Sequence, residues 1–239
     1  MMLRFILSSL AAVAFSAEAP IPVDSGAGRL SEQEGESIFQ RLVLPELVKA
    51  GASEEDADCL GAATGAFTRK GAAQTAVRYL ATITSHNDNP HGVAIIEDGE
   101  LLGRLEFESS YGGSISSLPD IDRNGLSELV LHDGTAGQGS GVDLISLLEL
   151  PGGKVRKLGF FKVHENDCGV EEGKGTRKDI RIFARPGPRP AFTQEILTGP
   201  CEGAVRPQGG ASPAKPEKDE SRYTFVRPKK KQNPGKASK

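Results

Sequence analysis

Aromatic residues are scarce in this chain. Of its 239 residues, none is tryptophan and only three are tyrosine. Sites that hold single-stranded nucleic acid stack successive bases on aromatic side chains, and this sequence offers no such platform. We therefore expect no specific nucleic-acid binding, and no aromatic-lined carbohydrate site.

Cysteine is also rare, and its spacing excludes the common metal and redox motifs. Cys59, Cys168 and Cys201 form no C-x-x-C pair, so a zinc site is not expected. In an exported protein three cysteines allow one disulfide and one free thiol. Cys168 and Cys201 flank a polar, Gly/Pro-rich segment that a crosslink would stabilise, so we predict that these two pair. A Cys168 thiolate acting with His164 is then not expected.

Several catalytic signatures are missing. The chain has neither G-x-S-x-G nor H-E-x-x-H. Its Gly-rich segment GTAGQGSG (134–141) lacks the terminal Lys-Ser/Thr of a phosphate-binding loop and leads into a strand, not a helix. We interpret it as a hairpin loop placed for recognition, with Gly137, Gln138 and Gly139 at its tip.

Long hydrophobic runs are absent as well. The apolar run from Phe5 to Phe15 is shorter than the roughly 20 residues that span a bilayer. Arg4 precedes it, and the small-x-small triplets at 14–16 and 17–19 follow, as in a secretory signal peptide. We predict a signal peptide over residues 1–19, with a buried N-terminal helix as the alternative. The mature protein is expected to be exported, periplasmic or extracellular, without a transmembrane segment.

The C-terminal segment is basic and of low complexity. Residues 206–239 contain ten lysines and arginines against three acidic residues, with many Pro, Gly and Ser. This composition predicts a disordered basic tail, with one strand at 222–226 (RYTFV). A solvated tail, which can fold back on the acidic remainder, is the favoured interpretation, and binding to nucleic acid or to an anionic envelope surface is the alternative.

Between these ends, the sequence predicts one domain in three parts. Residues 20–30 form an irregular lead-in. Residues 31–62 form a short helical unit, because Ser31 and Glu34 make a capping box before apolar residues with helical spacing. Pro45 either ends the first helix or starts a second one, and Ser53 resembles a further helix start. Residues 63–205 form a β domain.

The β domain is recognised by alternating apolar segments joined through short turns. Asp98-Gly99 is a two-residue hairpin signal between two of them, and no crossover helix intervenes. We predict a mainly β fold of antiparallel hairpins, in a partial propeller-blade-like or sandwich arrangement. Laying Gly71 over Gly125 also aligns two turn-glycine-strand segments at an offset of 54 residues, a sign of an internal repeat.

The segment LPDIDRNGLSELVLHD, Leu118 to Asp133, carries the strongest site pattern. Asp120, Asp122 and Asn124 alternate, Gly125 permits a sharp turn, and Glu128 is the ninth residue counted from Asp120. Calcium takes six to eight oxygen ligands from carboxylates, amides and carbonyls, which this mixture supplies. A bare hairpin turn with solvated acids and a magnesium site are the alternatives.

The residues from Asp120 to Leu131 resemble the D-x-[DN]-x-[DN]-G-x-x-[DE] loop of FG-GAP and VCBS repeats, which occur in integrin α-chain propellers and exported bacterial proteins. The resemblance implies a structural calcium ion bound by Asp120, Asp122, Asn124, the Leu126 carbonyl and Glu128. The earlier copy departs from the pattern: Thr68, Arg69 and Lys70 occupy ligand positions, and Gln74 aligns with Glu128. That copy is not expected to bind calcium.

The histidines provide weaker candidates. His86 and His91 lie in SHNDNPH (85–91), which predicts either a metal pair or only a turn. His132 is predicted to be a partly buried histidine, not a catalyst. The sequence thus favours a non-enzymatic, calcium-stabilised exported module that interacts with a protein or an envelope component. The alternatives are a secreted hydrolase that uses the acidic or histidine cluster, and a structural envelope-associated protein that uses the basic tail.

Overall fold

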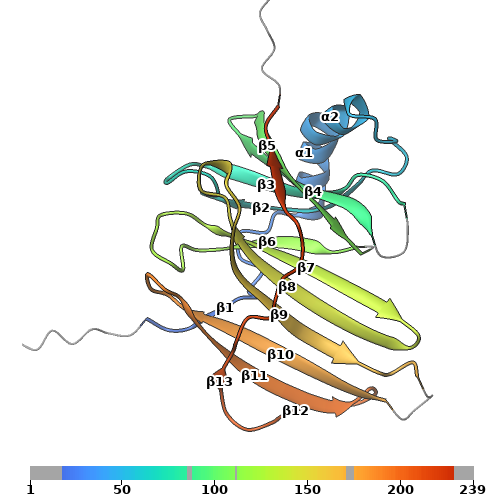
Figure 1. The fold of residues 1–239 in the computed structure, drawn as a ribbon, viewed down its shortest axis with the longest axis vertical. Helices are drawn as coiled ribbons and strands as arrows, with labels where there is room; N and C mark the ends of the chain where they lie inside the picture. Colours follow the sequence, from blue (N-terminus) through green and yellow to red (C-terminus); the bar gives the residue numbers. More distant parts are fainter. Residues whose placement is uncertain (1–17, 85–87, 111, 171–174, 229–239) are drawn as a thin grey trace, which may run out of the picture.

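Two antiparallel β-sheets make up most of the protein (Figure 1). The structure, a computed structural model, describes residues 18–84, 88–110, 112–170 and 175–228. The predicted mainly β, antiparallel fold is confirmed. The signal peptide predicted over residues 1–19 lies outside the described residues, except for Glu18 and Ala19.

A short helical unit covers the outer face of the smaller sheet (Figure 1). After β1 (Ile21–Pro22) it comprises α1 (Glu32–Ile38), a π-helical turn (Phe39–Val43) and α2 (Leu44–Lys49). The predicted capping box is present: the Ser31 hydroxyl accepts the Glu34 N–H at 3.3 Å, and the Glu34 carboxylate accepts the Ser31 N–H at 3.1 Å. Pro45 stands in the first turn of α2, directly after the π-helical turn.

The prediction that this helical unit extends to residue 62 is wrong. The helices end at Lys49, and β2 (Asp58–Gly65) is a strand. Gly51, with φ of +101°, follows the last helix in a conformation that a helix cannot continue through. The small residues of β2 let α1 approach closely, since a Cβ at Gly35 would lie only 3.3 Å from that of Ala62. Close packing between helix and strand therefore overrides the helix propensity of alanine.

The smaller sheet has five strands in the order β14-β5-β4-β3-β2. As predicted, Asp98 and Gly99 form the turn between β4 and β5, both with positive φ (51° and 78°), as a two-residue hairpin of the primed type requires. Besides β2, its strands are β3 (Gln74–Leu80), β4 (Asn89–Glu97), β5 (Glu100–Ser109) and β14 (Thr224–Val226).

The larger sheet has nine strands, and its main path β6 to β12 follows chain order. In addition, the short strands β1 and β13 pair with β10 and β11. A 3₁₀ turn (Pro151–Gly153) connects β8 to β9. Its other strands are β6 (Ser114–Leu118), β7 (Glu128–Gly137), β8 (Ser140–Glu149), β9 (Arg156–Asn166), β10 (Thr176–Arg185), β11 (Ala191–Pro200), β12 (Arg206–Pro207) and β13 (Ser212–Pro213).

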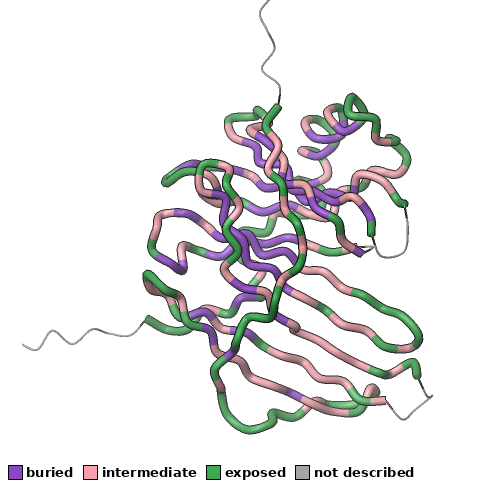
Figure 2. Tube along the Cα trace, in the orientation of Figure 1, coloured by how far each residue is buried: buried purple, intermediate pink, exposed green. Residues whose placement is uncertain are grey.

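Three apolar layers hold these elements together, and the buried residues gather where they meet (Figure 2). The two sheets pack against each other through one layer, which includes Leu129 and Leu131 of β7. Val130 points to the opposite face of the larger sheet and belongs to the second layer. In the third layer the helices cover Val77 and Tyr79. Because β3 is covered on both faces, its sequence is largely buried rather than alternating.

The internal repeat is visible in the strand arrangement. Strands β2–β5 and β6–β9 form two successive antiparallel units, and their first strands, β2 and β6, lie against each other. The first loops of the two units contact each other, since the Ser127 N–H donates to the Ala66 carbonyl at 3.0 Å. Gln74 and Glu128 begin the second strand of each unit, in agreement with the 54-residue offset.

The predicted disulfide joins Cys168 to Cys201, and Cys59 is free. The prediction of a disordered tail is wrong for residues 206–228, which run across both sheets (Figure 1). The strand predicted at 222–226 is present as β14, which pairs with β5. The few apolar residues of this segment contact different apolar layers: Ala214 belongs to the second layer and Phe225 packs against the first. The average composition of the segment does not reveal this spacing. Residues 229–239 lie outside the described residues.

Candidate metal centre

The acidic loop connects β6 to β7. The residues at its two ends, Leu118 and Glu128, are buried, and so are Ile121 and Leu126 within it. The apolar residues Leu118, Ile121 and Leu126 hold the loop against the core. As a consequence, Asp122 is only 7% exposed although it belongs to a surface turn.

Asp120 closes the loop through its carboxylate. One oxygen accepts the Asn124 N–H at 2.8 Å and the other accepts the Gly125 N–H at 2.6 Å. Gly125 has φ of +88°, and the alkyl chain of Lys70 passes 2.7 Å from the place where a Cβ would stand. Both the turn and the neighbouring loop therefore require glycine here.

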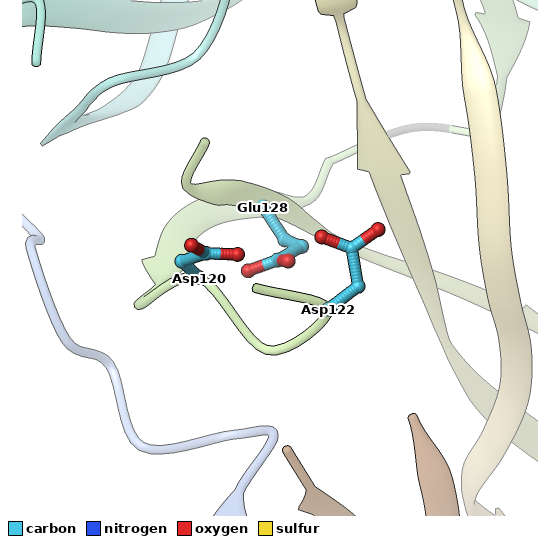
Figure 3. Close-up of side chains that lie close together, drawn as sticks. All are labelled: Asp120, Asp122 and Glu128. Atoms are coloured by element: carbon cyan, nitrogen blue, oxygen red, sulfur yellow. The ribbon is translucent and has the colours of Figure 1, made fainter. Parts of the chain in front are cut away.

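Three carboxylates converge inside this turn. One oxygen from each of Asp120, Asp122 and Glu128 lies within 4.8 Å of the others, and Figure 3 shows Glu128 between the two aspartates. Oε1 of Glu128 accepts the Ile121 N–H at 3.0 Å. Oε2 is buried and has no hydrogen-bond partner among the described residues. An unsatisfied carboxylate oxygen is costly to bury, so this atom marks a place where a cation or a proton is required.

Electrostatics supports the same conclusion. Burial is the main cause that raises the pKa of Glu128 to about 8, and the nearby carboxylates of Glu149 and Asp122 raise it as well. Without a cation, Glu128 is thus largely protonated at neutral pH. A bound divalent ion would replace that proton.

Two further residues complete the surroundings of the loop. Glu149, the last residue of β8, is fully buried and accepts the Asn124 Nδ2–H at 2.8 Å. Arg156, the first residue of β9, donates its Nε–H to Glu149 at 2.7 Å and also forms an ion pair with Asp122. Neither residue was predicted from the sequence, because they lie 25 and 34 residues beyond the loop residues that they contact. The only local sign of this pair in the sequence is an acidic residue at the end of a strand, followed by a turn and then by an arginine.

The residue types fit a hard cation. Asp120, Asp122 and Glu128 would supply carboxylate oxygens, with Asn124 as an amide ligand, and calcium accepts this donor set. The Asn124 side-chain oxygen is directed at the Leu126 N–H at 2.8 Å, so it would serve the turn as well as an ion. The Leu126 carbonyl stays a prediction.

The corresponding loop of the first unit has no need of a metal. Gln74 replaces the glutamate, and its Oε1 accepts the N–H groups of Phe67 and Thr68, both at 2.9 Å. Its Nε2 donates to Thr68 Oγ1 at 2.7 Å and to Glu97 at 2.9 Å. Both the oxygen and the nitrogen of the Gln74 amide therefore have hydrogen-bond partners, whereas Oε2 of Glu128 has none among the described residues.

Known proteins provide no further guide. No family model, curated protein or solved structure matches this chain. The resemblance of the loop to FG-GAP and VCBS repeats therefore stays an expectation.

The histidines do not gather at a second site in the described part of the chain, where the only group of metal-ligating side chains is the acidic loop. His86 lies outside the described residues. His91 is buried against Phe107, with ring centroids 5.9 Å apart, and burial lowers its pKa to about 4. His132 is partly buried, as predicted, with Nε2 3.5 Å from Asp24.

The predicted recognition loop is the tip of the β7–β8 hairpin. Gln138 and Gly139 have positive φ, Gly137 and Gln138 are exposed, and the Gly139 carbonyl accepts the Gly169 N–H at 2.7 Å. The tip therefore contacts the loop that the Cys168–Cys201 disulfide holds. In the described residues no helix combines the length and apolar character needed to cross a bilayer.

Proposed function

We propose that this protein is an exported, non-enzymatic β module in which calcium stabilises the loop from Asp120 to Glu128, as in the FG-GAP and VCBS repeats that the loop resembles. The observation that carries the proposal is the buried Oε2 of Glu128 beside Asp120 and Asp122, which has no hydrogen-bond partner in the part of the chain that the structure describes. The ion would have a structural role, because the loop itself supplies most of the ligands that calcium takes.

Thermal unfolding in calcium and in excess chelator tests this proposal. A ligand that binds only the native state stabilises it by mass action, so calcium at a hundredfold excess over Kd should raise the melting temperature by about 5–10 °C. Glu128→Gln keeps the shape of the side chain and reproduces the residue of the first unit, and it should abolish the shift.

Glu97→Gln is the matched control. Glu97 ends β4, contacts the loop of the first unit and lies outside the acidic loop. This variant should keep the full calcium shift. An equal melting temperature with calcium and with chelator in the wild-type protein would refute the proposal.

We further propose that the hairpin tip, Gly137 to Gly139, meets a protein or envelope partner. Its support is that Gly137 and Gln138 are exposed on a hairpin tip whose base is ordered by β-sheet pairing. Binding of the purified protein to isolated envelope material should fall when the tip is replaced by an Asn-Gly turn. Unchanged binding would assign the interaction to another surface, such as the basic tail.

A further inference from the structure

The acidic loop already has a cation in contact with it, the guanidinium of Arg156. This group bridges Asp122 and Glu149, and its Nε–H donates to Glu149 at 2.7 Å. The arginine side chain is 47% exposed, whereas the side chains of the two acids are 5% and 0% exposed. Arg156 therefore reaches from the surface to two buried carboxylates.

One arginine does not balance the charge of this cluster. Asp120, Asp122, Glu128 and Glu149 offer four carboxylates around the loop, and Arg156 contacts only two of them. Oε2 of Glu128 has no hydrogen-bond partner among the described residues, and the arginine's ion pairs there are with Asp122 and Glu149. The negative charge of the site that Arg156 leaves uncompensated would therefore favour one more cation.

The corresponding site of the first unit has the same arrangement, but there the charges are balanced. Glu97 ends β4 as Glu149 ends β8, and it accepts from Gln74 and pairs with Arg69. The loop there presents Thr68, Arg69 and Lys70 in place of the acids. A single arginine accordingly meets a single, largely buried carboxylate, and Gln74 adds no charge.

We propose that Arg156 is a built-in competitor of the metal ion, which stabilises the metal-free loop and lowers its calcium affinity. This inference rests on the proposed function. The guanidinium and the ion would share Asp122 as a partner, and two cations held against one buried carboxylate repel each other. Glu149 is the carboxylate that keeps the arginine when the ion binds, since it contacts Arg156 but belongs to β8 rather than to the loop.

Isothermal titration calorimetry of calcium into the metal-free full chain tests the inference, with Arg156→Gln compared to the wild-type protein. The variant should bind calcium more tightly, by about tenfold or more, because the repulsion is removed. Its melting temperature in chelator should fall, because Asp122 and Glu149 then lack the cation that they share. Arg69→Gln, the matched change in the first unit, should leave the calcium affinity unchanged.

A second variant covers the case in which Arg156→Gln fails to fold. Arg156→Lys keeps the charge but loses the two-pronged geometry, and it should bind calcium with an affinity within a few fold of wild type. An arginine that only orients Asp122 would give the opposite results, with weaker binding in both variants, and that outcome overturns the inference.

The outcomes separate this inference from the proposed function. Equal or weaker binding by Arg156→Gln, with normal binding by the wild type, overturns the competitor role alone. Binding by the variant but not by the wild type supports the competitor role, but it overturns the proposed function, because the wild-type protein then does not bind calcium. No binding by either protein overturns both.

Discussion

Glu128 should make the stability of the metal-free protein depend on pH. Its pKa is raised from 4.5 to about 8, so the folded state holds a proton that the unfolded state releases. The stabilisation is complete below about pH 4.5 and is lost as the pH rises toward 8. Each unit of pKa shift corresponds to about 1.4 kcal/mol, so the loss should amount to a few kcal/mol. Urea unfolding in chelator between pH 5 and pH 8 measures it.

Burial also raises the pKa of Glu149, so this residue contributes in the same direction. Glu128→Gln isolates the part that belongs to Glu128 and should flatten most of the pH dependence. Saturating calcium should flatten it too, because the ion keeps the carboxylate ionised in the folded state. A variant with the pH profile of the wild type would contradict the assignment.

Arg78 joins the two sheets and should be the most sensitive charged residue outside the loop. It is fully buried, and it donates to the carbonyls of Ser114 (3.0 Å) and His132 (2.7 Å) and pairs with Asp133 at 2.5 Å. Arg78→Met would leave Asp133 without its cation, which costs about 3–5 kcal/mol for a buried pair. Urea denaturation provides the measurement.

The control for Arg78 is Arg104→Met. Arg104 pairs with Glu106 at 3.0 Å, and the glutamate side chain is 43% exposed. Partly solvated pairs contribute at most about 1 kcal/mol, so this change should be mild. Similar losses in the two variants would mean that Arg78 does not bridge the sheets as described.

At the level of single residues, the sequence predicts site residues that lie close together in the chain, but not the contacts that the fold makes between distant strands. Asp120, Asp122, Asn124 and Glu128 are recognisable because they occupy one short turn. Glu149 and Arg156 come from the next hairpin, and Arg78 contacts residues 36 to 55 positions away. A single sequence contains no spacing rule for such contacts, which depend on strand register.

Among the elements, the C-terminal segment differs most from the structure that its composition predicts. Phe225 of β14 lies against Gly103 and Gly153, since a Cβ at either glycine would come within 3 Å of its ring. Tyr223 precedes β14 and donates its hydroxyl hydrogen to Ser146 Oγ at 3.1 Å. The segment thus connects the smaller sheet to the larger one.

Phe225→Ala should therefore destabilise the protein by about 2 kcal/mol, less than the 3–5 kcal/mol typical of a fully buried phenylalanine. Thermal and urea unfolding would measure the loss. Arg227→Ala, which removes one exposed contact to the Gly152 carbonyl, is the control and should change stability little. Equal effects of the two changes would show that β14 is not held by its aromatic residue.

The elements that the sequence predicts well have strong local signals. These are the Asp98-Gly99 turn, the capping box at Ser31 and the strand that follows the acidic loop. Strand β2 and the tail strands β12 and β13 are not predicted. Their residues are mostly small, polar or proline, and their place is decided by what they pack against, namely α1 and β11.

At the scale of the whole molecule, the two repeated units differ in how they neutralise a buried turn. The first unit uses Gln74 with Arg69, and the second uses acids with Arg156. Because the two loops contact each other through Ala66 and Ser127, an ion in the second loop would stabilise the junction between both sheets. The proposed calcium effect therefore concerns the whole fold rather than one turn.

A crystal structure of the protein grown with calcium tests this account most directly. The account predicts one ion inside the turn, at about 2.3–2.6 Å from oxygens of Asp120, Asp122 and Glu128. Arg156 should remain on Glu149. A turn without an ion at saturating calcium, with its carboxylates directed into solvent, would contradict the account.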